Sequence, residues 1–421
     1  MMIFTSIYGV VDGFFVSNFA GKTPFAAVNL IMPFLMIVTT IGFVFGTGGS
    51  AIVAKTLGEG DYDAATRYFS LFVYFSLALS VAVAAVSIIF LPEIAALLGA
   101  AGQMLDACVL YGRIILIALP FSVLQMEFQS FFVTAETPKL GLYVTVASGV
   151  TNMVLDAVLV ILLPQEFKLA GAAVATALSQ TVGGLVPLFY FGRKNNSLLA
   201  LGKTSFCGKI LVRACVNGSS EFMSNISMNL VGMLYNFQLM SYAGENGIAA
   251  YGVIMYVSMI FAAAFIGYSI GVAPIVGYHD GAGNYAELRG VLRKSLIIIG
   301  SFSFGMFVLA EAFAMPLSYL FVGYDGELID LTVSGFRIFS FSFLFMGFAI
   351  FSSGFFTALN DGVTSAVISF LRTLVFQVAA VLLIPVLLGI SGIWLSIVVA
   401  EVMAVAISVV FLLVKCKKFK S

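Results

Sequence analysis

The sequence predicts an all-α integral membrane protein with twelve transmembrane helices in two six-helix bundles. Three observations predict this fold: an apolar composition, a series of long apolar segments, and a repeat that relates the two halves. Of the 421 residues, 61% are hydrophobic and 10% are charged, whereas a soluble domain carries about 25% charged residues. A chain of this composition is expected to bury most of its length in lipid.

The apolar segments are long enough to cross a bilayer, because a spanning helix needs about 20 residues. Short connections with turn-forming residues separate them, such as Gly58-Glu59-Gly60-Asp61 and Gly244-Glu245-Asn246-Gly247. We expect the spans at residues 2–20, 25–50, 67–91, 108–133, 139–163, 168–192, 214–242, 247–276, 290–313, 329–356, 362–388 and 392–414.

The longest polar stretch, residues 193–213, predicts a cytoplasmic linker between two lobes. The N-terminal lobe would comprise residues 1–192, and the C-terminal lobe residues 214–421 with a short basic tail. Lys and Arg gather in this linker and in the tail, whereas the opposite side of the membrane has little beyond Lys22 and Lys168. The positive-inside rule therefore places both termini in the cytoplasm.

The two halves of the chain repeat each other. Gly58-x-Gly60-Asp61-Tyr62 matches Gly281-x-Gly283-Asn284-Tyr285 at an offset of 223. Further matches pair Ile52-Val53 with Ile275-Val276, Arg113-Ile114 with Arg337-Ile338, Phe131-Phe132 with Phe355-Phe356, and Gly171 with Gly392, at offsets of 221 to 224. Because each half has an even number of spans, the repeats run parallel and a pseudo-two-fold axis lies along the membrane normal. This arrangement is typical of transporters that rock two bundles around a central site.

Several classes of function are excluded or disfavoured by the residue inventory. The single histidine, His279, lies in a polar loop, and the four cysteines show no metal-binding spacing. Gly46-Thr47-Gly48-Gly49-Ser50 has no following Lys-Ser/Thr and lies in an apolar span, which indicates close helix packing and no phosphate cradle. With no nucleotide motif and zero net charge, we expect neither an enzyme nor a nucleic-acid partner, and no cofactor. An ion gradient or the substrate's own gradient would supply the driving force.

Two spans carry acids that are costly to bury. Asp12 lies in an apolar stretch of the first span, one helical turn after Tyr8, and an uncompensated carboxylate in lipid costs several kcal/mol. Asn152 and Asp156 are four residues apart and share one helix face. Their oxygens suit a small hard cation and equally a shared proton. Thr176, in the small-residue start of the sixth span, is within reach of the same place; hydrogen bonding between helices is the alternative.

The remaining intramembrane polar groups have weaker signals. Glu221 is a candidate for contact with substrate or ion, with a partly solvated place near the cytoplasmic interface as the alternative. Met223 and Met228 begin a Met-rich stretch that would suit a pliable cavity, although helix packing explains it as well. Glu127 and Glu401 read equally as interhelical hydrogen-bond partners. Three arginines, Arg113, Arg337 and Arg372, are expected near the starts of their spans.

These motifs together resemble the multidrug and toxic compound extrusion (MATE) transporters over the whole chain. The matching segments are Tyr8-x-x-Val11-Asp12, Gly58-x-Gly60-Asp61, Phe131-Phe132-Val133-Thr134-Ala135-Glu136-Thr137-Pro138-Lys139, Asn152-x-x-x-Asp156 and Gly171-Ala172-Ala173-x-Ala175-Thr176. The resemblance implies an antiporter of the bacterial plasma membrane, expected to be a monomer, that exports cationic, amphipathic small molecules in exchange for Na⁺ or H⁺.

The resemblance also implies where the coupling ion binds. The family's N-lobe site falls on Asp12, Asn152, Asp156 and Thr176 as possible Na⁺ ligands, with Tyr8 and Ala172 beside them. Glu221 falls where some members place a cavity acid. Some members carry a second acid in the tenth span, but here residues 329–356 hold only Asp330 at the outer edge, which argues against a cation site in the C-lobe.

Two other functions are weighed against export. Related folds flip lipid-linked saccharides, which requires a large cationic cavity, whereas the Lys and Arg residues here lie at span ends and in loops. An intramembrane transferase would need a cluster of acid, base or metal-binding groups, and the single histidine disfavours that class.

Overall fold

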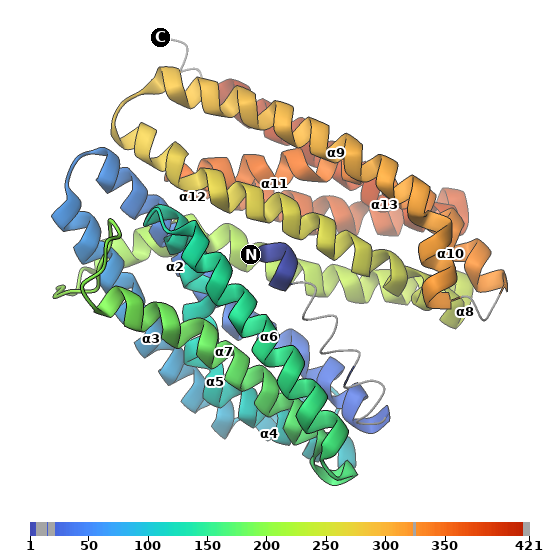
Figure 1. The fold of residues 1–421 in the computed structure, drawn as a ribbon. Helices are drawn as coiled ribbons and strands as arrows, with labels where there is room; N and C mark the ends of the chain where they lie inside the picture. The colour runs from blue at the N-terminus through green and yellow to red at the C-terminus, as the bar shows by residue number, and fades with distance from the viewer. Residues whose placement is uncertain (6–14, 16–21, 323–325, 416–421) are drawn as a thin grey trace. The chain divides into compact units, whose positions relative to one another are not determined.

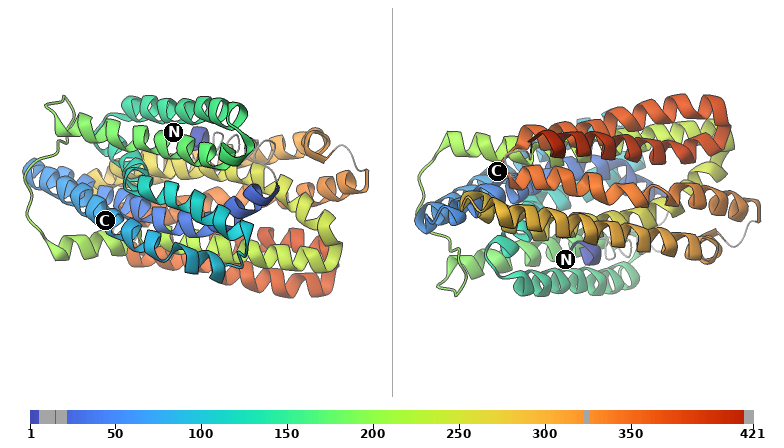
Figure 2. Two further views of the ribbon diagram at one scale, coloured as in Figure 1. Left: turned by 90° about the horizontal axis from the view of Figure 1, so that it is seen from below. Right: turned by 90° about the horizontal axis from the view of Figure 1, so that it is seen from above.

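The computed structural model describes residues 1–5, 15, 22–322 and 326–415, and these residues form helices, turns and loops without a β-strand. They divide into two compact units, Met1–Gly218 and Ser219–Ser421. The predicted first span, and with it Asp12 and Tyr8, lies almost entirely outside the described residues. The helices of each unit can be followed in Figure 1 and, from two further sides, in Figure 2.

The first unit is built around one central helix, α5. This helix packs against each of the other helices labelled in this unit in Figure 1. In its most apolar stretch of 18 residues, 61% of the residues are buried, against 33–44% in the unit's other long helices. The elements are α2 (Lys22–Gly58), α3 (Tyr62–Ile89), α4 (Leu91–Leu97), α5 (Gln103–Thr134), α6 (Pro138–Leu162), a 3₁₀ turn (Gln165–Phe167) and α7 (Lys168–Gly192).

The second unit contains longer helices that are broken at glycines. Gly244 has φ 59° inside α8, and Gly389 has φ 57° inside α13, a left-handed conformation that other residues rarely adopt. The elements are α8 (Gly208–Gly281), whose first turns belong to the first unit, α9 (Tyr285–Val322), α10 (Gly326–Ser340), α11 (Phe343–Ala358), α12 (Gly362–Phe370), the π-helical segment η3 (Leu371–Val375) and α13 (Phe376–Lys415).

Eight of the described helices are long and apolar enough to cross a membrane, or nine if α10 and α11, bent by 48°, form one span. The predicted boundary at 168–192 is confirmed by α7, and the predicted breaks between spans seven and eight and between eleven and twelve coincide with Gly244 and Gly389. The chain is therefore a multi-pass, all-helical membrane protein, and the full set of twelve spans stays a prediction.

Several helices extend beyond their predicted apolar ends. Helix α3 begins at Tyr62, five residues before the predicted span, because Asp61 caps it by accepting a 2.9 Å hydrogen bond from the Ala64 amide. A helix continues until a cap satisfies its terminal backbone groups, whether or not the sequence is still apolar. Hydropathy alone therefore underestimates the lengths of α3 and α9.

The repeat seen in the sequence extends to the backbone. Gly60 (φ 85°) and Gly283 (φ 67°) stand at the offset of 223, and Glu136 and Asn360, both with φ 57°, stand at an offset of 224. Glu136 and Asn360 are the only non-glycine residues with positive φ in the described part of the chain. The two halves thus use the same turn conformations at matching positions, which fixes the register between them.

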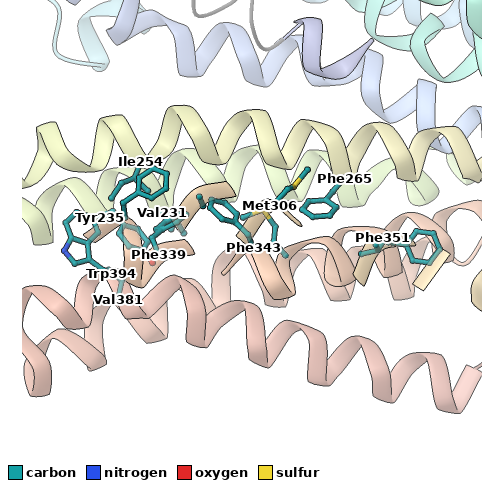
Figure 3. Close-up of a cluster of buried hydrophobic side chains, with 14 of the residues drawn as sticks. Val231, Tyr235, Ile254, Phe265, Met306, Phe339, Phe343, Phe351, Val381 and Trp394 are labelled. Atoms are coloured by element: carbon teal, nitrogen blue, oxygen red, sulfur yellow. The ribbon is translucent and has the colours of Figure 1, made fainter. Parts of the chain in front are cut away.

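Each unit has its own aromatic core. In the first, Phe128 stacks on Phe191 with ring centroids 5.5 Å apart, and Phe69 packs edge-on against both. In the second, Figure 3 shows Trp394 beside Tyr235 and Val381. A Cβ at Gly335 would lie 2.7 Å from the Trp394 ring, so α10 and α13 approach closely only because glycine stands there.

Candidate functional site

The predicted acid and amide on the fifth span lie on one buried face of α6. Asn152 is 1% exposed and Asp156 is 0% exposed, and the buried residues of this helix recur at intervals of three and four through Thr145, Ser148 and Val160. The prediction that the two side chains share a face is confirmed. This stripe is directed into the helix bundle, where lipid does not reach it.

Helix α7 supplies the third predicted group. The Asn152 amide Nδ2 lies 3.5 Å from the Thr176 hydroxyl, to which it donates, and Ala172, one turn earlier, is fully buried. A Cβ at Gly171 would lie 3.1 Å from the Leu159 side chain, so the small residues permit a close approach of α6 and α7. Figure 1 shows the two helices side by side. The predicted grouping of Asn152 with Thr176 is confirmed.

A second polar layer lies one turn below Asn152. Ser148 donates a 2.8 Å hydrogen bond to the backbone carbonyl of Ser179 and accepts a 3.2 Å bond from Gln125 of α5. A Cβ at Gly183 would lie 2.5 Å from the Gln125 side chain, so glycine makes room for that amide. This layer was not predicted, although Ser148 stands four residues before Asn152 on the same face.

The oxygens at this level suit a small cation or a proton. The Asn152 carbonyl oxygen accepts no hydrogen bond within the described part of the chain, and amide, carboxylate and hydroxyl oxygens are ligands that hard cations prefer. Among acidic and basic residues other than Asp156, α6 has only Lys139 and α7 only Lys168. Lys139 is about 25 Å along the helix from Asp156, and Lys168 about 12 Å from Thr176. The helix pair thus provides no positive charge of its own at this depth.

Glu127 lies on the other side of the central helix. Positions 125 and 127 are about 200° apart around a helix, so Glu127 faces α2 and α3 while Gln125 faces α6 and α7. It is fully buried and accepts a hydrogen bond from Ser76 of α3. A Cβ at Gly46 of α2 would lie 3.1 Å from the Glu127 Cα, which confirms that the glycine-rich segment serves helix packing. The reading of Glu127 as an interhelical hydrogen-bond partner is confirmed.

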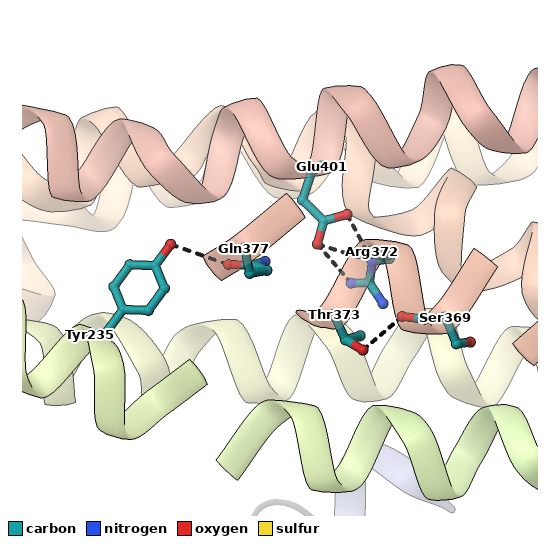
Figure 4. Close-up of polar contacts among 6 residues, drawn as sticks. All are labelled: Tyr235, Ser369, Arg372, Thr373, Gln377 and Glu401. Carbon is teal, nitrogen blue, oxygen red and sulfur yellow. Dashed lines mark hydrogen bonds and ion pairs between the residues drawn. The ribbon is translucent and has the colours of Figure 1, made fainter. Parts of the chain in front are cut away.

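The second unit holds a buried ion pair, Arg372–Glu401. Arg372 Nε lies 3.1 Å and 2.9 Å from the two carboxylate oxygens of Glu401, and Nη2 lies 2.8 Å from Oε1. Glu401 is 1% exposed. Next to the pair, the Tyr235 hydroxyl donates a 3.2 Å hydrogen bond to Gln377, as Figure 4 shows. The expectation that Arg372 lies near the start of its span is wrong: it lies in η3, ten residues after Gly362, where Glu401 holds it inside the bundle.

The predicted cavity residues lie on the surface of the second unit. Glu221 is half-buried in α8, and its backbone carbonyl accepts a 2.9 Å hydrogen bond from Asn225. Met223, Met228, Met233 and Met240 are 38–62% exposed, so the alternative of packing inside the unit does not apply to them. Their role as a substrate surface stays a prediction. No group of three or more His, Cys, Asp and Glu side chains suited to a metal ion occurs among the described residues.

Comparison with known proteins identifies relatives over nearly the whole chain. The family model MatE matches residues 1–158 and 222–383. The chain is 25% identical over 414 residues to the multidrug export protein MepA of Staphylococcus saprophyticus, covering 97% of this chain and 90% of that protein. It is 26% identical over 398 residues to MepA of Staphylococcus haemolyticus, covering 94% and 86%.

Solved structures have the same fold. A crystal structure of MATE in complex with MaL6 superposes with a TM-score of 0.94 at 23% identity, covering 100% of this chain and 95% of that chain. A MATE family transporter of the MOP superfamily in an outward-facing conformation superposes with a TM-score of 0.93 at 22% identity, covering 100% and 94%.

Proposed function

This chain belongs to the MATE family of efflux transporters, and we propose that it exports lipophilic cations in exchange for Na⁺ or H⁺. In the proposed arrangement, twelve transmembrane helices form two six-helix lobes that rock about a central binding site. The family assignment separates the chain from the transferase class, and nothing in either unit favours a lipid-linked saccharide as substrate.

The observation that carries the proposal is the buried oxygen cluster of Asn152, Asp156 and Thr176. A carboxylate inside a bundle is costly unless it is protonated or paired, and Asp156 is fully buried. Binding of a proton or Na⁺ offsets that cost. Asp12, which lies outside the described residues, would complete the site with Tyr8 beside it, and Ala172 would leave space for the ion.

Coupling requires only that ion and drug bias the same element in opposite directions. In the inward-open state, a lipophilic cation would enter the cavity and meet the exposed methionines, Met223 and Met228, and the carboxylate of Glu221. After the switch to the outward-open state, Na⁺ or H⁺ would occupy Asp12 and Asp156. Loss of that negative charge would weaken drug binding, so that the drug leaves to the outside.

The relatives named multidrug export proteins support a small-molecule substrate, and the acids in the predicted cavity support a positively charged one. We propose that the protein lies in the plasma membrane. The basic residues of the linker and the tail support a cytoplasmic location for both termini. We further propose that the chain works as a monomer without an organic cofactor.

Ethidium export from everted vesicles, driven in turn by a Na⁺ gradient and by a pH gradient, tests this function. We expect one of the two gradients to drive export by the intact chain, and Asp12→Asn and Asp156→Asn to abolish it while the protein is still inserted in the membrane. Asp106→Asn, at an exposed acid in the first turn of α5, is the matched control. Undiminished gradient-driven export by the Asp156→Asn chain would overturn the proposal.

A further inference from the structure

The repeat allows the cation site of the first half to be located in the second half. At the offset of 223, the turn glycine Gly21 matches Gly244, where α8 breaks. The same offset pairs Asp12 with Tyr235. In the second half, a neutral phenol thus stands at the position where the first half has its carboxylate.

The fifth span of each half continues the correspondence. The N-caps of α6 and α12 are related by an offset of 224, which pairs Ser148 with Arg372. The π-helical segment η3 begins just before Arg372, and a π turn adds one residue to a helix. Beyond it the offset becomes 225 and pairs Asn152 with Gln377. Ser148 and Asn152 face the sixth span of the first half. Arg372 likewise faces the sixth span of the second half.

The sixth span supplies the partner. Gly171 matches Gly392 at an offset of 221, which pairs Gln180 of α7 with Glu401 of α13. In the first half, Ser148 bonds Ser179 across this interface, whereas in the second half Arg372 bonds Glu401 across the same interface. Figure 4 shows that Tyr235 points to Gln377 and that Arg372 points to Glu401.

We propose that the Arg372 guanidinium serves the second half as a fixed internal cation, in the layer that matches Ser148 and Ser179 of the first half, one helical turn from the level of the proposed ion site. The proposal rests on the proposed function, because it assigns the coupling ion to the first half. A guanidinium remains charged at all physiological pH values and binds a carboxylate through two parallel hydrogen bonds. Because it is covalently attached, it cannot be released during a cycle, so the second half neutralises its acid permanently and binds no coupling ion.

The charges around the pair leave Arg372 as its counter-ion. Helices α11 and α12, which pack against η3 and α13, have no acidic or basic residue. Helix α8 contributes tyrosines at this level, and Glu221 precedes Tyr235 by about 21 Å along the helix. The other charged side chains on the packed helices lie toward helix ends: Glu327, Asp330 and Arg337 on α10 and Lys415 on α13.

The proposal predicts that a cation site appears when the internal cation is removed. In the Arg372→Met chain, the Glu401 carboxylate would remain buried without a positive partner and would take up Na⁺ or a proton. Arg372→Lys keeps a positive charge beside Glu401 and is the matched control, in which no cation uptake is gained.

The experiment uses the full chain, purified in detergent, with Asp156→Asn as background so that the first half does not bind the ion. Two quantities are measured: bound ²²Na⁺ per chain, and the infrared band of protonated carboxylic acids at neutral pH. We expect Arg372→Met in this background to gain one Na⁺ per chain or one protonated carboxyl, and the further change Glu401→Gln to remove the gain. No gain, or a gain that survives Glu401→Gln, would overturn the proposal.

A second comparison keeps the test decisive if the Arg372→Met chain does not fold. Residual Na⁺ binding in the Asp156→Asn chain that disappears on adding Glu401→Gln would show that the second half takes up a cation with Arg372 in place, and would overturn the proposal. A different result would separate the two proposals. If the Asp156→Asn chain binds as much Na⁺ and as many protons as the unchanged chain, Asp156 is not the coupling-ion site and the proposed function fails. If Glu401→Gln also changes neither quantity, the assignment of Arg372 as the counter-ion of Glu401 is not contradicted.

Discussion

The two halves of this transporter share turn conformations at matching positions but differ in the surroundings of a buried acid. In the first, Asp156 is buried on the same face of α6 as Asn152, whose amide donates a hydrogen bond to Thr176 of α7. In the second, Arg372 and Glu401 form a closed ion pair between the matching spans. The positive-φ turns at Gly60 and Gly283 and at Glu136 and Asn360 are common to both halves because they set the helix geometry. The buried side chains differ, and we propose that the first half exchanges a cation while the second acts as a rigid support.

The energetic consequences of the two solutions differ as well. A buried acid whose charge is neutralised by an exchangeable ion favours the ion-bound state and can couple to transport. A buried acid in a fixed ion pair becomes strongly destabilising when its partner is removed. The comparison thus predicts that changes in the first half affect transport and that changes at the ion pair affect stability.

The largest expected effect is on transport and comes from Asp156→Asn. Gradient-driven ethidium export should fall to the level of vesicles without the protein, because an amide cannot exchange a proton or neutralise Na⁺. Glu401→Gln should reduce the amount of folded protein but should not change the export rate per folded molecule. Export assays in vesicles, normalised to the amount of folded protein, measure both variants. If Glu401→Gln abolished gradient-driven export while Asp156→Asn remained active, the assignment of coupling to the first half would be wrong.

The next effect concerns the stability of the second unit. Arg372→Met leaves Glu401 buried without its partner, and breaking one side of such a pair costs about 3–5 kcal/mol. Replacing both by apolar residues, Arg372→Met with Glu401→Leu, should restore most of this loss. Denaturant unfolding in detergent micelles measures the two values. A double variant as unstable as the single one would mean that the pair does more than neutralise charge.

Helix packing in the first unit gives a smaller effect. A Cβ at Gly184 of α7 would lie 2.4 Å from the Phe121 carbonyl oxygen of α5, and overpacking of this kind costs about 1–3 kcal/mol. Gly184→Ala should therefore lower the unfolding midpoint and, because α7 carries Thr176, weaken Na⁺ or proton binding. Gly192→Ala, with no atom within 4 Å of the added Cβ, is the control and should behave as the unchanged chain.

The smallest expected effect is on stability and concerns the N-cap of α12. Asp361 caps α12 with its side chain, whereas Thr137 at the matching position makes no such bond to α6. Burial by itself would raise the pKa of Asp361, but hydrogen bonds from Lys415 and Thr364 outweigh it and hold the pKa below its ordinary value. The folded state then favours the ionised form, so the contribution is present at neutral pH and fades as the pH falls below about 4. With Lys415 44% exposed, the ion pair is worth at most about 1 kcal/mol.

Two substitutions check this prediction in thermal unfolding at pH 7 and pH 3. Asp361→Asn keeps an N-cap side chain but loses the ion pair, and should lower stability more at pH 7 than at pH 3. Asp361→Ala also loses the cap and should lower it by about 1 kcal/mol more. An Asp361→Asn chain that is destabilised equally at both pH values would contradict the role of charge.

The sequence alone predicted the parts of this account that depend on local periodicity. Asn152 and Asp156, four residues apart, had to share a face, and the start of α7 had to pack closely because its residues are small. Ser148 was missed although it continues the four-residue spacing of Asn152 and Asp156, and Gln125 was missed because a single glutamine in an apolar helix gives no periodic signal. The pairing of Arg372 with Glu401 joins residues 29 positions apart on two helices, a contact that has no local signature in the sequence.

We propose that one coupling cation is exchanged in each cycle, at the first half only. Ethidium carries one positive charge, so exchange of one Na⁺ or H⁺ for one ethidium moves no net charge across the membrane. In proteoliposomes with the membrane potential clamped by a K⁺ gradient and valinomycin, the ethidium gradient reached at a fixed Na⁺ or pH gradient should be the same at every potential. A steady ethidium gradient that changes with the clamped potential would mean that a second cation moves, and would contradict the account.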